Sequence, residues 1–575
     1  MVSIPADFKY SRRIRMAFLP VLLAGSIVLT GVFLPAGVGL DSDGRWGPFH
    51  LLLAWIGAIL FATGLFPWFH PAWMCLYYNF WRPHVSIPFE QSQFNQRLQI
   101  ARRHRAVSWW LDHPVRAARI FVVILLVACG FIYSAYAIGG RGVPPANQAN
   151  YYSLLTDAFR HGQLSLRLEP DPALARLTYP YDPAQREGIP YPWDVSYFQG
   201  KYYLYWGPTP VLGQIFLEAF APNPVQGSDL IVLFTLGMTA MISGILLHVW
   251  RRFFPNVTPL ALTLILVAAA FSNPILWQVS LATVYEIAVV AGQFYLLAGL
   301  WAALPVLYNE SLKMPRLILA AVCWSLAVGA RSTLAVPVIF LAGWCAWRLL
   351  RKRENCLAGL FALGTPLALG AGGLMMYNYL RFASVLDFGQ HYQLNSLDQY
   401  ANRNLLFRSV YVPINLFNYL FNPVDVLARF PFIEARKTTL VIPAFGWSAP
   451  NFYGSQPVAG LLTTIPFLLT LIAFAILLLF PKTRAGIAPA VRRLTIPLSI
   501  TALLALGVVL FFFSCSMRYV MDSAPTLLVI SGIAGMALLD WGRQASHRGW
   551  VPWLMLALSL TTVAIGLLLG LSGQI

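Results

Sequence analysis

The sequence predicts an all-α, multi-pass membrane protein with about thirteen transmembrane helices. Hydrophobic residues make up 58% of the 575-residue chain and charged residues only 11%, whereas ordinary soluble domains contain about 25% charged residues. The mean hydropathy is +0.63. The apolar residues gather in stretches of about 20, the length at which a helix crosses the hydrocarbon core of a bilayer. The chain must therefore face lipid along much of its length.

Two of the apolar stretches precede residue 118 and the others follow it. The predicted spans are 16–37, 49–69, 118–138, 228–250, 258–276, 283–305, 316–330, 332–350, 356–378, 457–480, 494–514, 523–541 and 550–571. The basic start followed by an apolar run is also typical of a signal peptide, but 16–37 is long enough to span and a second span follows at once. We expect a two-helix extension at 1–117 and a core at 118–575.

The distribution of positive charge predicts the orientation. With Lys9, Arg12, Arg13 and Arg15 in the cytoplasm, alternation of the spans puts most of the 40 lysines and arginines in or beside short cytoplasmic loops, as the positive-inside bias requires. The long loops 139–227 and 379–456 are then extracytoplasmic. The net charge of +18 reflects this topology and contact with anionic membrane lipids, so no nucleic acid is expected as a partner.

The one long cytoplasmic segment, 70–117, lacks a Walker or Rossmann glycine motif, which excludes those nucleotide-binding patterns. Its Phe94, Leu98 and Ala101 recur at helical spacing before Trp109 and Trp110, a pattern that favours a helix lying at the lipid interface. The six cysteines lie in or beside predicted spans, so they form neither a disulfide framework nor a metal-ligand pattern.

The first outer loop is predicted to begin with an amphipathic helix along the membrane surface. Its apolar positions are Tyr151, Leu154, Leu155, Ala158 and Phe159, and its wet face carries Asn150, Ser153, Asp157 and His161. Beyond this helix, repeated prolines argue against regular helix. Asp182 and Asp194 are therefore expected to be presented from ordered turns.

Three acids of this loop are candidate catalytic residues, and each has a structural alternative. Asp182 precedes a proline and is a common turn starter, whereas Asp157 is within helical reach of His161 and Arg160. Asp194 is flanked by the aromatic stretch WDVSYFQGKYYLYWGPTP, which suits contact with a hydroxylated ligand. The candidate ligand contacts in that stretch are Lys201, Tyr202, Tyr203 and Tyr205.

Four ionisable residues lie at the outer ends of predicted spans, where charge is costly and function is the default hypothesis. They are Glu286, Arg331, Arg518 and Asp522. Alternation places all four on the side of both large loops, which predicts one shared cavity. Arg518 and Asp522 could instead pair across one helical turn. Arg331 has no acid at helical spacing, so it is the better candidate for an anionic ligand such as phosphate.

Six strings, in order, resemble the GT-C superfamily of integral-membrane glycosyltransferases, in particular its bacterial branch related to dolichyl-phosphate-mannose-type protein transferases. They are NQANYYSLLTDAFRHGQLSL, WDVSYFQGKYYLYWGPTP, VYEIA, ARSTLAVP, YNYLRFASVLDFGQHYQL and RYVMDSAP. The resemblance covers about residue 118 to the end. It implies a GT-C-like core, a polyprenyl-phosphate-linked sugar donor, a lipid, glycan or protein acceptor, and transfer at the outer face of a bacterial cytoplasmic membrane.

One departure bears on catalysis. Many members carry an acidic pair just after the first core span, where this chain has Asn147-Gln148, and amides cannot act as a base. The base then shifts to Asp194, with Asp157 and Asp182 as reserves, or the protein is a non-catalytic relative. The implied roles are donor phosphate for Arg331 and Lys201, orientation of a hydroxyl or a cation for Glu286, and sugar contact for Tyr202, Tyr203 and Tyr205.

Arg518 and Asp522 complete the expected substrate-binding set. No cofactor is predicted; the acids are compatible with a divalent cation, but no metal ligands are assigned. A transporter or flippase of lipid-linked sugars is the rival, because it also places ionisable residues in spans and needs no base. No internal repeat of the kind found in many transporters is evident, and the acid-bearing first loop favours an enzyme. A structural scaffold is the third alternative.

Overall fold

The computed structural model describes residues 19, 22–29, 57–58, 61, 113–139, 150–308, 313–352, 355–442, 445–544 and 548–573. The predicted spans 16–37 and 49–69, the interfacial segment 70–117 and Asn147-Gln148 lie wholly or largely outside these residues. Within them the chain is mostly helical, and eight helices are long and apolar enough to cross a membrane, or nine if one bent pair counts as a single span. A multi-pass membrane protein, as the sequence predicts, fits these helices.

The eight helices coincide with predicted spans, with ends that differ by a few residues. They are α7 (Pro114–Gly139), α11 (Gly227–Phe253), α14 (Val284–Leu307), η3 with α16 (Ser332–Leu334 and Ala335–Lys352), α17 (Cys356–Phe382), α22 (Pro489–Leu510), α24 (Ala524–Arg543) and α25 (Val551–Ser572). The helix α15 (Met314–Ala330) is shorter. The predicted boundary between 316–330 and 332–350 corresponds to the break at Arg331.

Two predicted spans are interrupted. The stretch 258–276 is divided into α12 (Pro259–Ala270) and α13 (Asn273–Leu281), which meet at a bend of 44°. The stretch 457–480 becomes α19 (Leu461–Thr464), η8 (Pro466–Leu468) and α20 (Leu469–Leu479). A proline stands in the first turn of both α13 and η8, where its missing N–H is tolerated. Ile465, the residue before the η8 proline, is not helical, as is expected of the residue before a proline.

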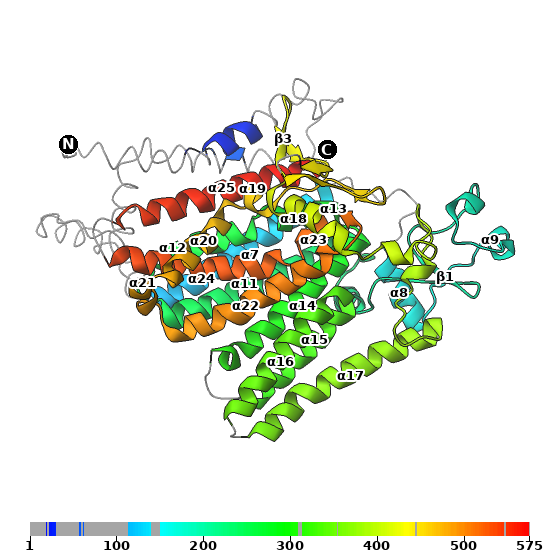
Figure 1. The fold of residues 1–575 in the computed structure, drawn as a ribbon, viewed down its shortest axis with the longest axis horizontal. Coiled ribbons are helices and arrows are strands. Elements are labelled where there is room, and N and C mark those ends of the chain that lie inside the picture. Colours follow the sequence, from blue (N-terminus) through cyan, green and yellow to red (C-terminus); the bar gives the residue numbers. More distant parts are fainter. Residues whose placement is uncertain are drawn as a thin grey trace, which may run out of the picture.

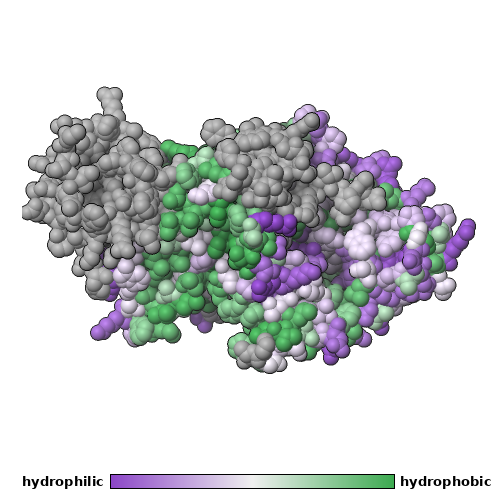
Figure 2. All heavy atoms as spheres, turned by 90° about the horizontal axis from the view of Figure 1, so that it is seen from above, coloured by the Kyte–Doolittle hydropathy of each residue, from purple (hydrophilic) through white to green (hydrophobic). Residues whose placement is uncertain are grey.

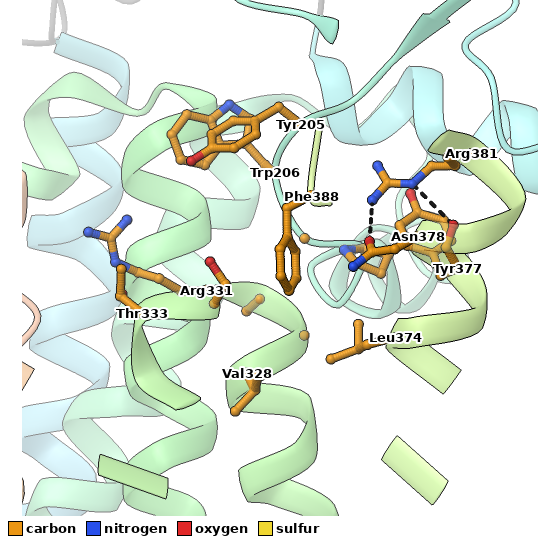
Figure 3. Close-up of a pocket in the computed structure, with 15 residues that line it drawn as sticks. Tyr205, Trp206, Val328, Arg331, Thr333, Leu374, Tyr377, Asn378, Arg381 and Phe388 are labelled. Atoms are coloured by element: carbon orange, nitrogen blue, oxygen red, sulfur yellow. Dashed lines mark hydrogen bonds between the residues drawn. The ribbon is translucent and has the colours of Figure 1, made fainter. Parts of the chain in front are cut away.

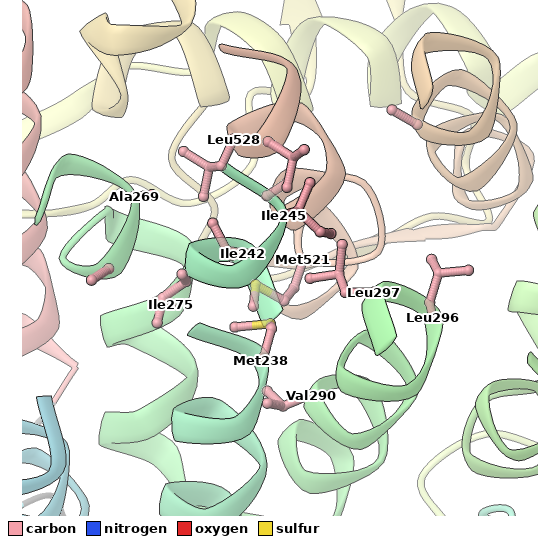
Figure 4. Close-up of a cluster of buried hydrophobic side chains, with 14 of the residues drawn as sticks. Met238, Ile242, Ile245, Ala269, Ile275, Val290, Leu296, Leu297, Met521 and Leu528 are labelled. Atoms are coloured by element: carbon pink, nitrogen blue, oxygen red, sulfur yellow. The ribbon is translucent and has the colours of Figure 1, made fainter. Parts of the chain in front are cut away.

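The helix α14 occupies the centre of the bundle, between α11 and α15 (Figure 1). Gly299 of α14 faces the Trp324 indole of α15 so closely that an added Cβ would lie 2.3 Å from its Nε1. Close approach at small residues is how helices gain van der Waals contact within lipid. Side chains of α11, α12, α13, α14 and α24 fill the interior, as Figure 4 shows for Met238, Ile242, Ile245, Ala269, Ile275, Val290, Leu296, Leu297 and Leu528.

The two long loops contain short helices and hairpins. The first holds α8 (Tyr151–Arg160), α9 (Pro172–Arg176), η2 (Pro183–Arg186), the hairpin of β1 (Ser196–Phe198) and β2 (Lys201–Tyr203), and α10 (Val211–Glu218). The second holds η4 (Gln390–Tyr392), η5 (Arg403–Leu405), η6 (Ser409–Tyr411), α18 (Val412–Phe421), the hairpins β3–β4 (Val424–Val426, Ile433–Ala435) and β5–β6 (Val441–Ile442, Trp447–Ser448), and β7 (Gly454–Ser455). The strand β7 pairs in parallel with β8 (Ser514–Cys515). Two short helices, α21 (Pro481–Ala485) and α23 (Met517–Val520), lie later in the chain.

The first loop lies at one end of the helices. Figure 1 shows α8, α9 and β1 at the right-hand end of the bundle. Figure 2 shows hydrophilic side chains gathered at the same end, with hydrophobic ones over the helices. This separation is expected of a chain whose helices face lipid and whose loops face water.

The amphipathic helix is present as α8, with Tyr151, Leu155 and Ala158 buried. Asn150 is not on its wet face as predicted. The Asn150 side chain instead caps the helix, because its oxygen accepts from the backbone N–H of Tyr152 at 3.1 Å. The expectation that the prolines exclude regular helix beyond α8 is also wrong for α9, which begins at Pro172. Proline is favoured at a first helical position because that N–H has no partner there.

The sidedness of this arrangement is open to a direct test. A single cysteine at the exposed Gln185, in a variant without other cysteines, is expected to react with an impermeant maleimide in intact spheroplasts. This result is expected because the positive-inside bias predicts that the loop is extracytoplasmic. Protection of the thiol until the membrane is permeabilised would reverse the orientation and move the candidate site to the cytoplasm.

Candidate functional site

Asp194 lies where the two long loops meet. Its backbone N–H donates to the carbonyl of Leu394 at 2.9 Å, and the Leu394 N–H donates back to Val195 at 2.9 Å. The backbone of Asp194 has φ of +61°, a left-handed conformation that Asp and Asn adopt more readily than most residues. The preceding Trp193 is held from α8, because the Tyr151 hydroxyl donates to its carbonyl at 2.7 Å. Both loops therefore fix the position of this acid.

The Asp194 carboxylate has three hydrogen-bond donors, one from α14 and two from the second loop. The Tyr285 hydroxyl of α14 donates to Oδ2 at 2.7 Å, and the amides of Gln393 and Asn395 each donate to Oδ1 at 2.9 Å. A carboxylate has about four acceptor positions. The network thus orients Asp194 and leaves one position for a ligand.

Tyr285 connects this acid to the charged residues at the helix ends. The Arg518 guanidinium stacks over the Tyr285 ring, 4.6 Å from its centroid, and Arg518 interacts electrostatically with Glu286. The Nε of Arg518 is buried without a hydrogen-bond partner. Glu286, in the first turn of α14, is 2% exposed. Its carboxylate accepts a hydrogen bond from the hydroxyl of Thr283, the N-cap residue of that helix. An acid, a tyrosine and an unsatisfied arginine donor thus lie in one chain of contacts.

Arg331 has an acidic partner, contrary to the sequence-based expectation. Its Nε and Nη2 donate to the two carboxylate oxygens of Asp522 at 2.5 and 2.7 Å. The exposed fractions of the two side chains are 7% and 1%. Asp522 is therefore paired with Arg331. It is not paired with Arg518, which precedes Asp522 by four residues. The sequence spacing suggested the wrong partner because α23 and α24 bring Asp522 against the end of α15.

The first loop docks on the end of α15 beside this pair. Gly207 touches α15 so closely that an added Cβ would lie 2.0 Å from the Gly329 carbonyl oxygen, and the Thr209 N–H donates to that oxygen at 3.2 Å. Only glycine allows such an approach. Tyr205 and Trp206, just before it, are thereby held near the end of α15, and the Trp206 ring packs edge-on against Tyr285 of α14 at 5.0 Å. Burial raises the pKa of Tyr205, so its hydroxyl keeps its proton and can donate.

A pocket lies between this docked segment and the C-terminal end of α17 (Figure 3). Tyr205, Trp206 and Arg331 lie on one side of it, and Leu374, Tyr377 and Arg381 of α17 on the other. Its free volume of about 50 Å³ holds a few water molecules, at 10–15 Å³ or more for each. Figure 3 shows the Arg331 side chain extending away from Phe388 and Leu374, as its bond to Asp522 requires.

Arg381 is the pocket cation that has no carboxylate within ion-pair distance in the described part of the chain. It is 3% exposed. Its Nη1 donates to the Leu204 carbonyl at 2.8 Å and its Nη2 to the Asn378 side chain at 2.9 Å. The guanidinium also stacks on the Tyr377 ring at 3.8 Å. These contacts fix the guanidinium and leave N–H groups for a ligand, since arginine has five.

The other predicted site residues lie elsewhere. Asp157 pairs with Arg167 at 3.0 Å and with His161 at 3.3 Å, and Asp182 caps η2 by accepting from the Ala184 N–H at 3.0 Å. These contacts match the structural alternatives given above, a pair with His161 for Asp157 and a local turn for Asp182. Lys201 is exposed in the β1–β2 hairpin. Tyr202 is buried against Tyr197, and Tyr203 packs edge-on against Phe382. Of the three tyrosines, only Tyr205 lines the pocket.

Sequence reasoning missed several residues of this region. Tyr285 stands beside Glu286, and Arg381 is a single charge at the end of an apolar stretch, so the rule that flags ionisable residues at span ends would have found Arg381. Gln393 and Asn395 carry no such signal, because amides are common in loops. Their role follows only from the pairing of the two loops.

Among the residues that the structure describes, no group of three or more His, Cys, Asp and Glu side chains is placed to hold a metal ion. Comparisons with known proteins add no identification: no family model, no curated protein and no solved structure matches this chain.

Proposed function

We propose that this chain is a membrane glycosyltransferase that moves a sugar from a polyprenyl-phosphate-linked donor to a hydroxyl of a lipid, glycan or protein acceptor. One observation carries the proposal: Asp194 is oriented by three donors at the junction of both loops, and one of these donors, Tyr285 of α14, packs against Trp206, which lines an aromatic pocket that contains a buried arginine. A base, sugar-contacting rings and a phosphate cation are the groups that such a transfer needs.

In the proposed reaction the oxygen of the acceptor hydroxyl attacks the anomeric carbon of the sugar. Asp194 accepts the proton that this hydroxyl loses. The bond between that carbon and the phosphate oxygen breaks, and the electron pair leaves with the lipid phosphate. The free acceptor position on Asp194 suits the incoming hydroxyl. Arg381 is the residue we assign to the leaving phosphate, because a guanidinium matches phosphate oxygens in pairs.

The pocket has an apolar route for the prenyl chain. Val328 of α15 and Leu374 of α17 line it, and the neighbouring Met375, Met376 and Leu369 are exposed on α17. These side chains face lipid when α17 spans the membrane. A prenyl chain can then lie in the bilayer along α17 while its phosphate reaches Arg381. The pocket must widen to admit the sugar, because its present volume suits only a small group.

The proposal is tested by incubating the purified full chain with radiolabelled polyprenyl-phosphate sugars and total membrane lipids. Label is expected to pass from one of these donors to an acceptor. Binding of the donors without transfer, or movement of intact donor across a vesicle membrane, would contradict the enzyme and support a carrier.

In this assay Arg381→Lys is expected to raise the KM for the donor about tenfold or more, with a smaller change in the KM for the acceptor. Lysine keeps the charge but lacks the paired donors, and a hydrogen bond to a charged group contributes about 1.5–3 kcal/mol. Arg403→Lys, at an exposed loop arginine that stacks on Tyr400, is the matched control and should leave both values unchanged. An Arg381→Lys defect confined to the acceptor would remove Arg381 from the donor site.

A transporter of lipid-linked sugars remains the second candidate, and one observation favours it. The α12–α13 pair is bent by 44°, and broken helices often line transporter sites. The break is packed, however: an added Cβ on Gly566 of α25 would meet the Phe271 carbonyl oxygen at 1.9 Å. Ser272 and Asn273 are fully buried there, and the pocket is lined by other elements.

A further inference from the structure

Four arginines gather where α16 ends and α22 begins, at the end of these helices farther from α8 and β1 (Figure 1). This arginine cluster consists of Arg348 of α16, of Arg351 and Arg493, which interact electrostatically with it, and of Arg492, next to Arg493 on α22. We propose that it binds the phosphate of an anionic phospholipid. The site is separate from the proposed sugar transfer and does not depend on it.

The cluster has donors that the described residues do not satisfy. Nε and Nη2 of Arg348 and Nε of Arg492 are buried without a hydrogen-bond partner. The charged groups that act on Arg348 are Arg493 and Arg351, both of like sign. Guanidinium groups of like charge repel one another, and each buried donor without a partner destabilises the fold. An anion between the two helices removes both penalties.

The start of α22 adds to the positive potential. No side chain caps it, and its first turn contains no acid. Pro489 has no N–H, and the Val491 and Arg492 N–H groups donate to the Ala488 carbonyl, which leaves the Ala490 N–H for an anion. The aligned peptide dipoles place about half a positive charge at this helix start. Arg492 ends that turn and Arg493 follows it. Phosphate is the anion that a helix start and paired guanidinium groups both favour.

The surface next to the cluster favours a lipid over free phosphate. Val336, Ile339, Trp347 and Leu350 of α16 are exposed, and together with Gly343 they follow one another every three or four residues, so they form one apolar stripe. Gly343 stands within this stripe, and an added Cβ there would meet nothing within 4 Å, which leaves a notch for an acyl chain. Arg351 stacks 4.3 Å above the Trp347 ring, so the basic and apolar surfaces are continuous.

The test uses the purified full chain in detergent, titrated with phosphatidylglycerol, with phosphatidylcholine of the same acyl chains, or with inorganic phosphate. Phosphatidylglycerol is expected to raise Tm, and native mass spectrometry to show it bound; the other two should do neither. Arg348→Gln/Arg492→Gln is expected to weaken phosphatidylglycerol binding about thirtyfold, because each basic residue near anionic lipid contributes about 1 kcal/mol.

The matched control is Arg251→Gln/Arg484→Gln, which removes two exposed arginines from α11 and α21 and should leave binding nearly unchanged. An equal loss in this control, wild-type binding in the cluster variant, or equal stabilisation by inorganic phosphate would each overturn the proposal. If the cluster variant does not fold, Arg493→Gln, at an exposed position, replaces it with an expected loss of about fivefold.

Discussion

Asp194→Asn is expected to lower the rate of sugar transfer by about two to four orders of magnitude, the usual contribution of a general base. The variant should fold normally. Asparagine adopts the left-handed backbone that position 194 requires. Its oxygen can still accept from Gln393 and Asn395, and its NH₂ can donate to the Tyr285 hydroxyl, which is able to reverse its role. Turnover of radiolabelled donor and Tm of the purified variant measure the two effects separately.

Asp157→Asn and Asp182→Asn are the controls in the same loop. Asp157 pairs with Arg167 and His161 at the surface, and Asp182 caps a short helix, so each variant should retain near-normal turnover. An exposed ion pair of this kind contributes about 1 kcal/mol or less. Normal turnover in Asp194→Asn together with loss in either control would transfer the role of base to that acid. Normal turnover in all three would contradict the proposed mechanism.

Asp522→Ala is expected to lower the free energy of unfolding by about 3–5 kcal/mol, because it leaves the buried Arg331 charge without its partner. The bidentate contact and the 7% and 1% exposures of the two side chains place this pair among those for which loss of one member is costly. Reversible unfolding by dodecyl sulfate in mixed micelles measures the change. Asp425→Ala, which breaks the half-exposed pair of Asp425 with Arg436, should cost no more than about 1 kcal/mol.

A double variant distinguishes the effect of the charge pair from that of the volume that the two side chains fill. Arg331→Met/Asp522→Leu is expected to recover most of the stability lost in Asp522→Ala, because apolar residues of similar volume often replace a buried ion pair without cost. Recovery of stability without recovery of transfer would give Arg331 a part in the reaction as well as in the fold. A loss in Asp522→Ala as small as that in Asp425→Ala would contradict the buried pair.

The spans, and with them the membrane class, were largely predictable from sequence. Eight predicted spans coincide with long apolar helices. Their positions follow from the local sequence, because an apolar stretch of about 20 residues matches the thickness of the hydrocarbon core. The interruptions were harder to predict. Prolines stand where α13 and η8 begin, yet Pro305, Pro366 and Pro497 lie inside continuous helices. Neighbouring helices decide whether the backbone groups freed by a proline are satisfied.

The sequence by itself determined an amphipathic helix at α8, acids and aromatics in the first loop, and costly charges at the ends of spans. Only the tertiary structure decided which of these residues act together. Asp194 meets Tyr285 across 91 residues and Gln393 across 199, and Arg331 meets Asp522 across 191. Periodicity reveals partners three or four residues away. The partners of a charge at a helix end depend instead on which helices pack side by side and on how the loops pair over them.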